Sequence, residues 1–379
     1  VVAEYVKRNA DVLQADRQAR MLFCNRGNVH PGDVVRNEAL AESIRAIRKE
    51  GPNVFYSGRI AESIVRTLRS LGSPMTLGDL ASHRTESPAP VRMPWRDLEI
   101  CAHPPNSQGV VAPLVQCMLE GDAAEPQAQW MHLAIEAFKL AFEERDSRIG
   151  DPETTKPIDD LLAPTMIAYL RSRIDPTRAA IRQLAPQEGG TVAIVCVDAD
   201  GRAISLIQSL FMGFGSGIVA EGTGIFLHNR GAYFSLEPGH PNELHGGKRP
   251  LHTLSPAMAL KNGRPFLVYG TMGGDGQPQT QVQLLHNILE RGMNVQEAID
   301  APRFVYGRDS ESQFVDNVRI ESRFDAETIS LLRARGHKVI QLQPFDHAAG
   351  HAQVIQIDEA RGSMAGGADP RADSAALPL

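Results

Sequence analysis

The first half of the chain is patterned as a series of amphipathic helices. Apolar residues recur at spacings of three and four, as Leu40, Ile44 and Ile47 do on one face of a segment that Gly51 ends. Such stripes are typical of helices that pack against a core, so we expect a mostly helical first half. The predicted helices span residues 37–51, 60–72, a short segment opened by the cap-like Thr76-Leu77-Gly78-Asp79, 108–119 and 130–145.

The pattern changes to strands at Thr191. A β-branched run over 191–197, a polar turn over 198–201 and a second run over 203–208 predict a hairpin. Hairpin strands with helices grouped outside them favour an α+β fold with antiparallel sheets over a parallel doubly wound sheet. Further predictions are strands at 265–269 and 353–357, helices at 277–291 and 325–335, a glycine-rich ordered loop region at 209–250, and a weakly patterned tail after 365.

Composition narrows the class of protein. The 379 residues suffice for one large or two ordinary domains, and the net charge of −6 excludes the basic face that binding to nucleic acid or anionic membranes requires. No apolar run approaches the ~18 residues of a membrane-spanning helix. The scattered histidines have no HExxH spacing, so we expect neither a metal site nor a cofactor.

The four cysteines bear on the compartment. They lie far apart without CxxC spacing and are predicted to be buried free thiols, which favours a cytoplasmic location. The chain begins at Val1 rather than at Met, so a periplasmic or secreted location stays open.

The junction Gly189-Gly190-Thr191 is the first candidate for chemistry. Most such sequences simply lead a loop into a strand. If the Gly190–Thr191 bond is cut, however, Thr191 becomes an N-terminal residue whose hydroxyl is a nucleophile and whose own amine is the adjacent base. A free α-amine has a pKa of about 8, so it can accept that proton near neutral pH.

The motifs after this junction occur in the order found in a known enzyme family. They are Asp198-Ala199-Asp200-Gly201, Phe214-Gly215-Ser216-Gly217-Ile218-Val219, Gly224-Ile225-Phe226-Leu227-His228-Asn229, Gly247-Lys248-Arg249-Pro250, Ser255-Pro256, Gly273-Gly274 and Ala301-Pro302-Arg303-Phe304. With upstream matches such as Arg145-Asp146 and Gly150-Asp151-Pro152, the chain resembles the γ-glutamyltranspeptidases along nearly its whole length.

The resemblance implies an N-terminal-nucleophile (Ntn) hydrolase fold, a four-layer αββα sandwich with two antiparallel sheets between helical layers. It implies that residues 1–190 belong to a large subunit and 191–379 to a small catalytic subunit of one precursor, and it leaves open a homodimer of such heterodimers. Thr191 matches the nucleophile, Ser209 the hydroxyl that hydrogen-bonds it, and Gly273 and Gly274 the oxyanion-hole pair. Without the resemblance, Gly273-Gly274 would be interpreted as a tight turn. A phosphate-binding loop is disfavoured because no Lys-Ser/Thr follows the glycines.

The expected substrate contacts depart from the family pattern. Tyr233 stands where the family has an acidic residue, Phe211 where it has Asn, and His252-Thr253 where it has a Ser-Ser pair. His252 is therefore either a substrate contact or a loop histidine bonded to backbone, and Arg230 is either a second contact, for an anionic group, or a surface or structural charge. Asp275 is expected either to cap a helix or to serve an anion-excluding or hydrogen-bonding role.

Three functional hypotheses follow. The first is an amidohydrolase or acyltransferase that cleaves γ-glutamyl or related amides, with a small amide as substrate and water or an amine as acceptor. The second keeps this machinery but changes the acyl group, as in the oxamate amidohydrolase-like and cephalosporin acylase-like proteins of a divergent bacterial branch. The third is an unprocessed, non-catalytic binding relative.

Overall fold

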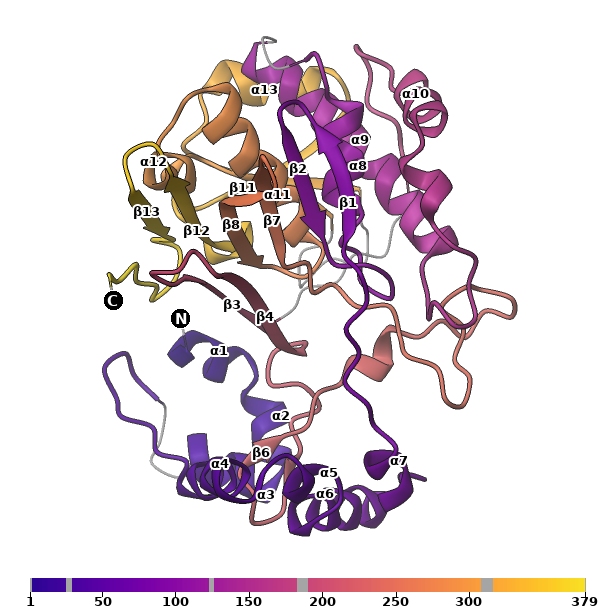
Figure 1. Ribbon diagram of the computed structural model, residues 1–379, viewed down its shortest axis with the longest axis vertical. Helices are drawn as coiled ribbons and strands as arrows, with labels where there is room; N and C mark the ends of the chain where they lie inside the picture. Colours follow the sequence, from indigo (N-terminus) through magenta and orange to yellow (C-terminus); the bar gives the residue numbers. More distant parts are fainter. Residues whose placement is uncertain (1, 25–28, 123–125, 183–189, 308–315, 379) are drawn as a thin grey trace. The chain divides into compact units, whose positions relative to one another are not determined.

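Two units make up the chain in the computed structural model (Figure 1). The first comprises Val1–Pro88 and Leu210–Arg230, and the second Ala89–Ser209 and Gly231–Leu379. The structure describes all residues except 1, 25–28, 123–125, 183–189, 308–315 and 379. Each unit draws residues from both sides of the Gly190–Thr191 bond, so the division at residue 190 stays a prediction about subunits.

The first unit is helical around a two-stranded ribbon. The predicted cap at Thr76 is present, because Thr76 forms a capping box with Asp79. Asn37, predicted as the first residue of a helix, instead caps α4 by accepting a hydrogen bond from the Leu40 N–H. Its elements are α1 (Val2–Arg8), α2 (Ala10–Ala15), α3 (Arg17–Phe23), α4 (Glu38–Glu50), α5 (Asn53–Tyr56), α6 (Arg59–Ser70), α7 (Leu77–Ala81), β5 (Val219–Ala220) and β6 (Ile225–Phe226).

The second unit is built on a six-stranded antiparallel sheet in the order β1-β2-β7-β8-β12-β13. Its strands are β1 (Val91–Trp95), β2 (Leu98–Ala102), β7 (Ala257–Lys261), β8 (Arg264–Met272), β12 (His351–Asp358) and β13 (Ser363–Ala368). A separate three-stranded sheet joins β9 (Phe304–Tyr306), β10 (Asn317–Glu321) and β11 (Lys338–Leu342), with β10 and β11 parallel.

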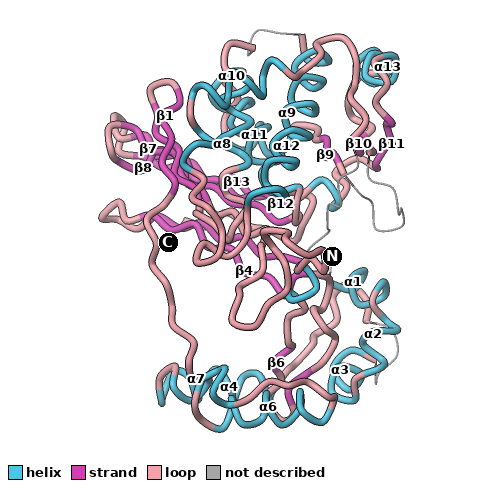
Figure 2. The backbone as a smooth tube through the Cα atoms, turned by 90° about the vertical axis from the view of Figure 1, so that its right-hand side faces the viewer, coloured by secondary structure: helices cyan, strands magenta, loops and turns pink. Residues whose placement is uncertain are grey.

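Helices cover one face of the six-stranded sheet (Figure 2). Leu267 and Tyr269 of β8 pack into one apolar cluster with Leu284 and Leu285 of α11. Helices α8 and α12 also contact this sheet, and the long α9 packs on α8. These helices and their neighbours are α8 (Val111–Met118), α9 (Gln127–Arg148), α10 (Pro164–Ser172), α11 (Gly276–Leu285, continued by a π-turn over His286–Glu290), α12 (Val295–Asp300) and α13 (Ala326–Ala334).

The predicted hairpin forms a second β layer on the opposite face. Strands β3 (Gly190–Val197) and β4 (Ala203–Phe211) pair with each other. A Cβ added to Gly270 would lie 3.3 Å from Ser205 Oγ and 3.4 Å from Ala193 Cβ, so Gly270 turns toward the hairpin. Successive side chains of a strand point to opposite faces, so the hairpin and the α11 cluster lie on different sides of β8. The mixed α/β class with antiparallel sheets is confirmed.

Some elements differ from the sequence prediction. The first half is not helical throughout, because β1 and β2 form a hairpin over 91–102 whose buried residues alternate with more exposed ones. Helix α8 begins at Val111, three residues after the predicted start. The tail is not loose: β13 pairs with β12, and Asp369 and Arg371 are buried among ion pairs with Arg303 and Glu321.

The four cysteines are free thiols, but each is only partly buried rather than fully buried as predicted. Burial raises the pKa of the Cys117 thiol to about 11, which keeps it protonated and unreactive at neutral pH. Among the described residues, no helix has the length and apolar character needed to cross a membrane.

The neutral form of His351 at the start of β12 makes stability depend on pH. Burial lowers its pKa to about 4, although Asp369 opposes that shift. An unfolded histidine has a pKa of about 6.5, so below that pH the unfolded chain binds the extra proton more readily. We expect the free energy of unfolding to fall by about 2 kcal/mol between pH 8 and pH 5 through this group.

The measurement is urea unfolding of His351→Gln and of the parent across that pH range. His351→Gln should flatten the dependence by about that amount, and His30→Gln, at an exposed site, should leave it unchanged. An unaltered slope in His351→Gln would contradict the prediction.

Candidate active site

Thr191 is the second residue of β3, in the hairpin that lies on β8. Its Oγ1 is shielded from solvent and makes no hydrogen bond within the described residues. A buried polar atom without a partner costs free energy, so its retention in a structured strand points to a functional role. The preceding residues 183–189 lie outside the described part of the chain, and Gly190 is the first residue of β3.

Ser209 and the carbonyl of Gly190 face each other across the hairpin. The Ser209 Oγ donates a hydrogen bond of 2.7 Å to the Gly190 carbonyl oxygen. That carbonyl belongs to the peptide bond ahead of Thr191. Ser209 therefore lies next to Thr191, the nucleophile that the sequence predicts. Its hydroxyl donates to the carbonyl that would be attacked during cleavage.

We expect Ser209→Ala to slow cleavage at Gly190–Thr191 by about 10–100-fold, because the carbonyl oxygen loses a donor as it becomes negatively charged. The measurement is the rate at which the full-length band disappears on a denaturing gel. Ser205→Ala is the matched control, since Ser205 lies on the same strand and donates to the Tyr269 carbonyl at 2.9 Å. Equal rates in the two variants would remove the role assigned to Ser209.

Gly273 and Gly274 connect β8 to α11. Their φ angles of +133° and +57° lie in the range that residues with a side chain rarely adopt. The turn is closed by hydrogen bonds from the Gly276 N–H to the Gly273 carbonyl (2.8 Å) and from the Gln277 N–H to the Gly274 carbonyl (3.2 Å). The glycines thus precede the N-terminal end of a buried helix, where backbone N–H groups and the helix dipole favour negative charge.

Three of the predicted substrate contacts belong to the second unit. Thr253 is buried and its carbonyl accepts hydrogen bonds, while His252 is partly buried with its ring 5.7 Å from that of His103. The backbone of His252 bonds Asn106 and Gln108. Tyr233 packs at the edge of the large apolar cluster, and its carbonyl accepts a bond from Asn242.

The other two predicted contacts, Phe211 and Arg230, belong to the first unit. Phe211 is fully buried with a φ of +83°, and the Arg230 guanidinium lies 4.8 Å above its ring. Arg230 is itself only 9% exposed. The alternative that Arg230 is a solvated surface charge, which the sequence left open, is therefore wrong. A cation held over an aromatic face is a stabilising arrangement.

Asp275 does not cap α11, which corrects one of the two roles expected for it. It occupies the cap position without a side-chain bond to the helix N–H groups, and instead pairs with the buried Arg145 of α9. Sequence spacing gave no sign of this pair, because the two residues are 130 positions apart.

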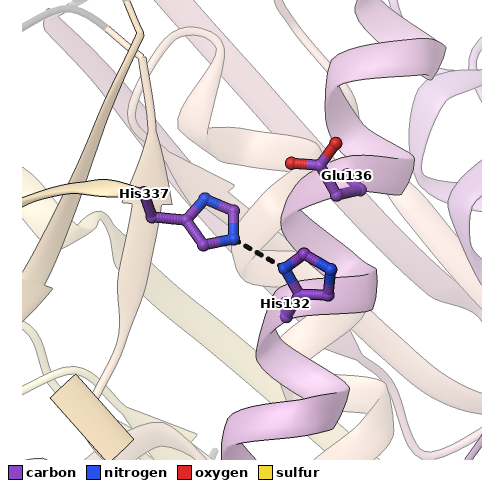
Figure 3. A group of neighbouring side chains, drawn as sticks. All are labelled: His132, Glu136 and His337. Atoms are coloured by element: carbon purple, nitrogen blue, oxygen red, sulfur yellow. Dashed lines mark hydrogen bonds between the residues drawn. The ribbon is translucent and has the colours of Figure 1, made fainter. Parts of the chain in front are cut away.

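One group of potential metal ligands was also missed by sequence. His132, Glu136 and His337 are buried, and their ligand atoms lie within 4.8 Å of one another (Figure 3). His132 and Glu136 are one turn apart on α9, but His337 is brought in from beyond α13.

The chemistry of this group does not favour a metal. His132 Nδ1 and His337 Nε2 share a 2.8 Å hydrogen bond, and the Lys139 ammonium lies 2.8 Å from the Glu136 carboxylate. Metal-bound imidazoles normally donate their other N–H to an acceptor, whereas His337 Nδ1 has no partner within the described residues. These contacts already occupy His132 Nδ1, His337 Nε2 and the Glu136 carboxylate, and the absence of a metal stays a prediction.

A cavity of about 770 Å³ lies elsewhere in the second unit. Its lining includes Trp130, Gln283, His286 and Glu297. Gln283 and His286 are at the C-terminal end of α11, whereas Gly273 and Gly274 precede its N-terminal end. None of the predicted site residues lines this cavity, so it does not bear on the proposed chemistry.

Comparison with known proteins places these features in a family context. The family model described as Gamma-glutamyltranspeptidase matches residues 1–379. The chain is 38% identical over 379 residues to the glutathione hydrolase-like YwrD proenzyme of Bacillus subtilis, covering 98% of this chain and 72% of that protein. It is 39% identical over 351 residues to the oxamate amidohydrolase proenzyme of Klebsiella pneumoniae, covering 91% of this chain and 66% of that protein.

A solved structure agrees with the sequence comparison. The cephalosporin acylase from Bacillus halodurans superposes with a TM-score of 0.87 at 33% identity, covering 99% of this chain and 69% of that one. The chain thus spans about two thirds to three quarters of the length of these three proteins.

Proposed function

Because the chain belongs to the gamma-glutamyltranspeptidase family, a family of Ntn-type hydrolases and transferases, we propose that it is cut at Gly190–Thr191 and cleaves small amides through an acyl-enzyme on Thr191. The observation that carries this proposal is the Ser209 hydrogen bond to the carbonyl of Gly190, directly ahead of the buried Thr191 hydroxyl.

Cleavage of the precursor begins with the Thr191 hydroxyl. Its Oγ attacks the Gly190 carbonyl carbon, the C–N bond to Thr191 breaks, and the acyl group moves to oxygen as an ester while the nitrogen takes up the hydroxyl proton. Water then hydrolyses the ester, which frees the Gly190 carboxylate and the Thr191 amine. The Ser209 hydroxyl donates to the carbonyl oxygen on which negative charge develops.

Turnover reuses the same oxygen. The freed α-amine of Thr191 accepts the hydroxyl proton as Oγ attacks the substrate amide, and the N–H groups of Gly273 and Gly274 donate to the oxyanion. The protonated amine then gives its proton to the leaving nitrogen, which departs as an amine or as ammonia. Water or an acceptor amine attacks the ester and regenerates Thr191, so ping-pong kinetics should follow.

The acyl group is proposed to be a small acid rather than a full γ-glutamyl residue. Tyr233 carries no charge that could pair with a substrate ammonium. His252 and Thr253, which belong to the same unit as Tyr233, offer donors for a carboxylate. The resemblance to an oxamate amidohydrolase proenzyme supports this acyl class, while a γ-glutamyl amide is the second candidate.

Two assays separate the candidates. Ammonia release from oxamate and nitroaniline release from γ-glutamyl-4-nitroanilide are measured side by side on the purified protein. Turnover of oxamate above that of the anilide supports the small-acid pocket, and the reverse order assigns a γ-glutamyl pocket. A single full-length band on a denaturing gel, with neither activity, would favour the non-catalytic relative.

The large and small subunits of one precursor are then partners of each other. The proposed cleavage would separate residues 1–190 from 191–379, yet α9 from before the cut packs against α13 from after it within the second unit. The two fragments should therefore co-purify after cleavage.

A further inference from the structure

We infer that Gln108 and Arg145 are positioning residues for the loop of Gly273 and Gly274, called here the oxyanion loop. Gln108 holds the Gly274 carbonyl, and Arg145 neutralises the charge of Asp275. This inference rests on the proposed function, because it concerns how Gly273 and Gly274 are aimed and what charge surrounds them. It adds two residues, from two separate parts of the chain, to the predicted site.

Gln108 joins the oxyanion loop to the loop that contains His252 and Thr253, two of the predicted substrate contacts. Its side-chain nitrogen donates to the Gly274 carbonyl and to the Thr253 carbonyl, both at 3.0 Å, and its backbone N–H donates to the His252 carbonyl at 3.0 Å. Gln108 is fully buried. Because the Gly274 carbonyl is fixed from both sides, by Gln108 and by the Gln277 N–H, the peptide that follows the oxyanion N–H groups cannot rotate freely.

Arg145 holds Gln108 and Asp275 at once. One guanidinium nitrogen donates to Gln108 Oε1 at 2.7 Å and pairs with the Asp275 carboxylate, and Nε pairs with Asp146 at 2.7 Å. The Arg145 and Asp275 side chains are only 2% and 4% exposed, so this ion pair is shielded from water. Burial opposes the charge on Arg145, but the carboxylates of Asp146 and Asp275 outweigh it and raise its pKa above the ordinary value.

The sign of the charge explains why the pair matters. Asp275 follows Gly274 directly, so an uncompensated carboxylate there would lie beside the place where an oxyanion develops. Like charges in a water-poor site repel strongly, and the transition state would lose stabilisation that the ground-state amide does not need. With Arg145 paired to it, Asp275 fixes the loop without adding net negative charge.

The test is a double-mutant cycle on the complete protein, with γ-glutamyl-4-nitroanilide and oxamate as probes. Arg145→Met should lower kcat about 100-fold with KM changed less than about threefold, as expected when transition-state stabilisation alone is lost. Asp275→Asn should stay within about fivefold of the parent. The double variant should recover at least about tenfold over Arg145→Met, because removing the carboxylate removes the repulsion.

Arg148→Met is the matched control, since Arg148 lies on the same helix and pairs with Glu144 and Asp160 near the surface. It should leave kcat unchanged. Gln108→Ala carries no charge change and should lower kcat about tenfold through loss of the donor to Gly274. If Arg145→Met fails to fold, the double variant and Gln108→Ala still decide: a double variant much less active than Asp275→Asn, or an unchanged Gln108→Ala, overturns the inference.

Failure of this inference differs from failure of the proposed function. If Thr191→Ala is inactive while the double variant is no better than Arg145→Met, the nucleophile stands and Arg145 has only a structural role. If Thr191→Ala remains active, the proposed chemistry is wrong and the oxyanion assignment falls with it.

Discussion

Thr191→Ala is expected to leave the chain uncut and to lower amide turnover by at least about 10⁴-fold, as loss of a covalent nucleophile does in other acyl-transfer enzymes. The substitution removes the oxygen that is proposed to attack both the Gly190 carbonyl and the substrate carbonyl. The buried Thr191 Oγ1 makes no hydrogen bond within the described residues, so little stability should be lost with it. The measurements are a denaturing gel, the N-terminal residue of any smaller fragment, and kcat with both amide probes.

Thr191→Ser is the control for this experiment. It keeps a hydroxyl on an N-terminal residue after cleavage, so processing and measurable turnover should both survive. If Thr191→Ala gives two fragments and the smaller one begins with the substituted alanine, another group cuts the chain. Turnover by an uncut Thr191→Ala protein would show that another residue is the nucleophile.

Local sequence patterns predicted much of the fold. The β-branched run that begins at Thr191 predicted the β3–β4 hairpin, and the helical stripes predicted α4 and α6, with Thr76 as the predicted cap of α7. These elements could be predicted because their signals lie within a few residues of one another, in caps, turns and periodicity. The family resemblance then supplied the layer arrangement that periodicity alone left open.

The strands β1 and β2 show where that reasoning fails. Their alternation is short, and Pro94 stands inside β1, a residue that sequence rules associate with strand edges or non-strand segments. β1 is in fact the edge of the six-stranded sheet, where a missing N–H is tolerated. The tail after Ala365 was missed for another reason, because Asp369 and Arg371 are ordered by ion pairs with residues far back in the chain.

The candidate site was predictable only where chemistry is local. Thr191 and its glycine could be singled out from adjacent residues, but the partner of Asp275 could not, because Arg145 of α9 meets Asp275 only in the folded unit. The contact of His132 with His337 could not be predicted for the same reason, because the two residues are far apart in the sequence. Sequence thus singled out candidate catalytic residues more readily than the residues that hold them in place.

The loop of Gly273 and Gly274, the proposed oxyanion loop, gives the second large expected effect. Gly273→Ala should lower kcat by about 10²–10³-fold with little change in KM, which is the range observed when an oxyanion donor is lost. A Cβ on Gly273 would meet no atom closer than 3.7 Å, so the damage comes from the φ of +133°, which alanine avoids. The backbone must rotate to relieve that strain, and the N–H groups of Gly273 and Gly274 then turn away from the oxyanion.

Gly263→Ala separates this effect from general strain. Gly263 lies in the turn that enters the same strand β8, has a φ of +75°, and would place its Cβ in open space. Both substitutions should cost about 1 kcal/mol of stability for the unfavourable φ, and thermal unfolding checks that they do. Because only Gly273 adjoins the proposed oxyanion site, Gly263→Ala should keep full kcat. Equal losses of kcat in the two variants would mean that strain in β8, rather than aimed N–H groups, controls turnover.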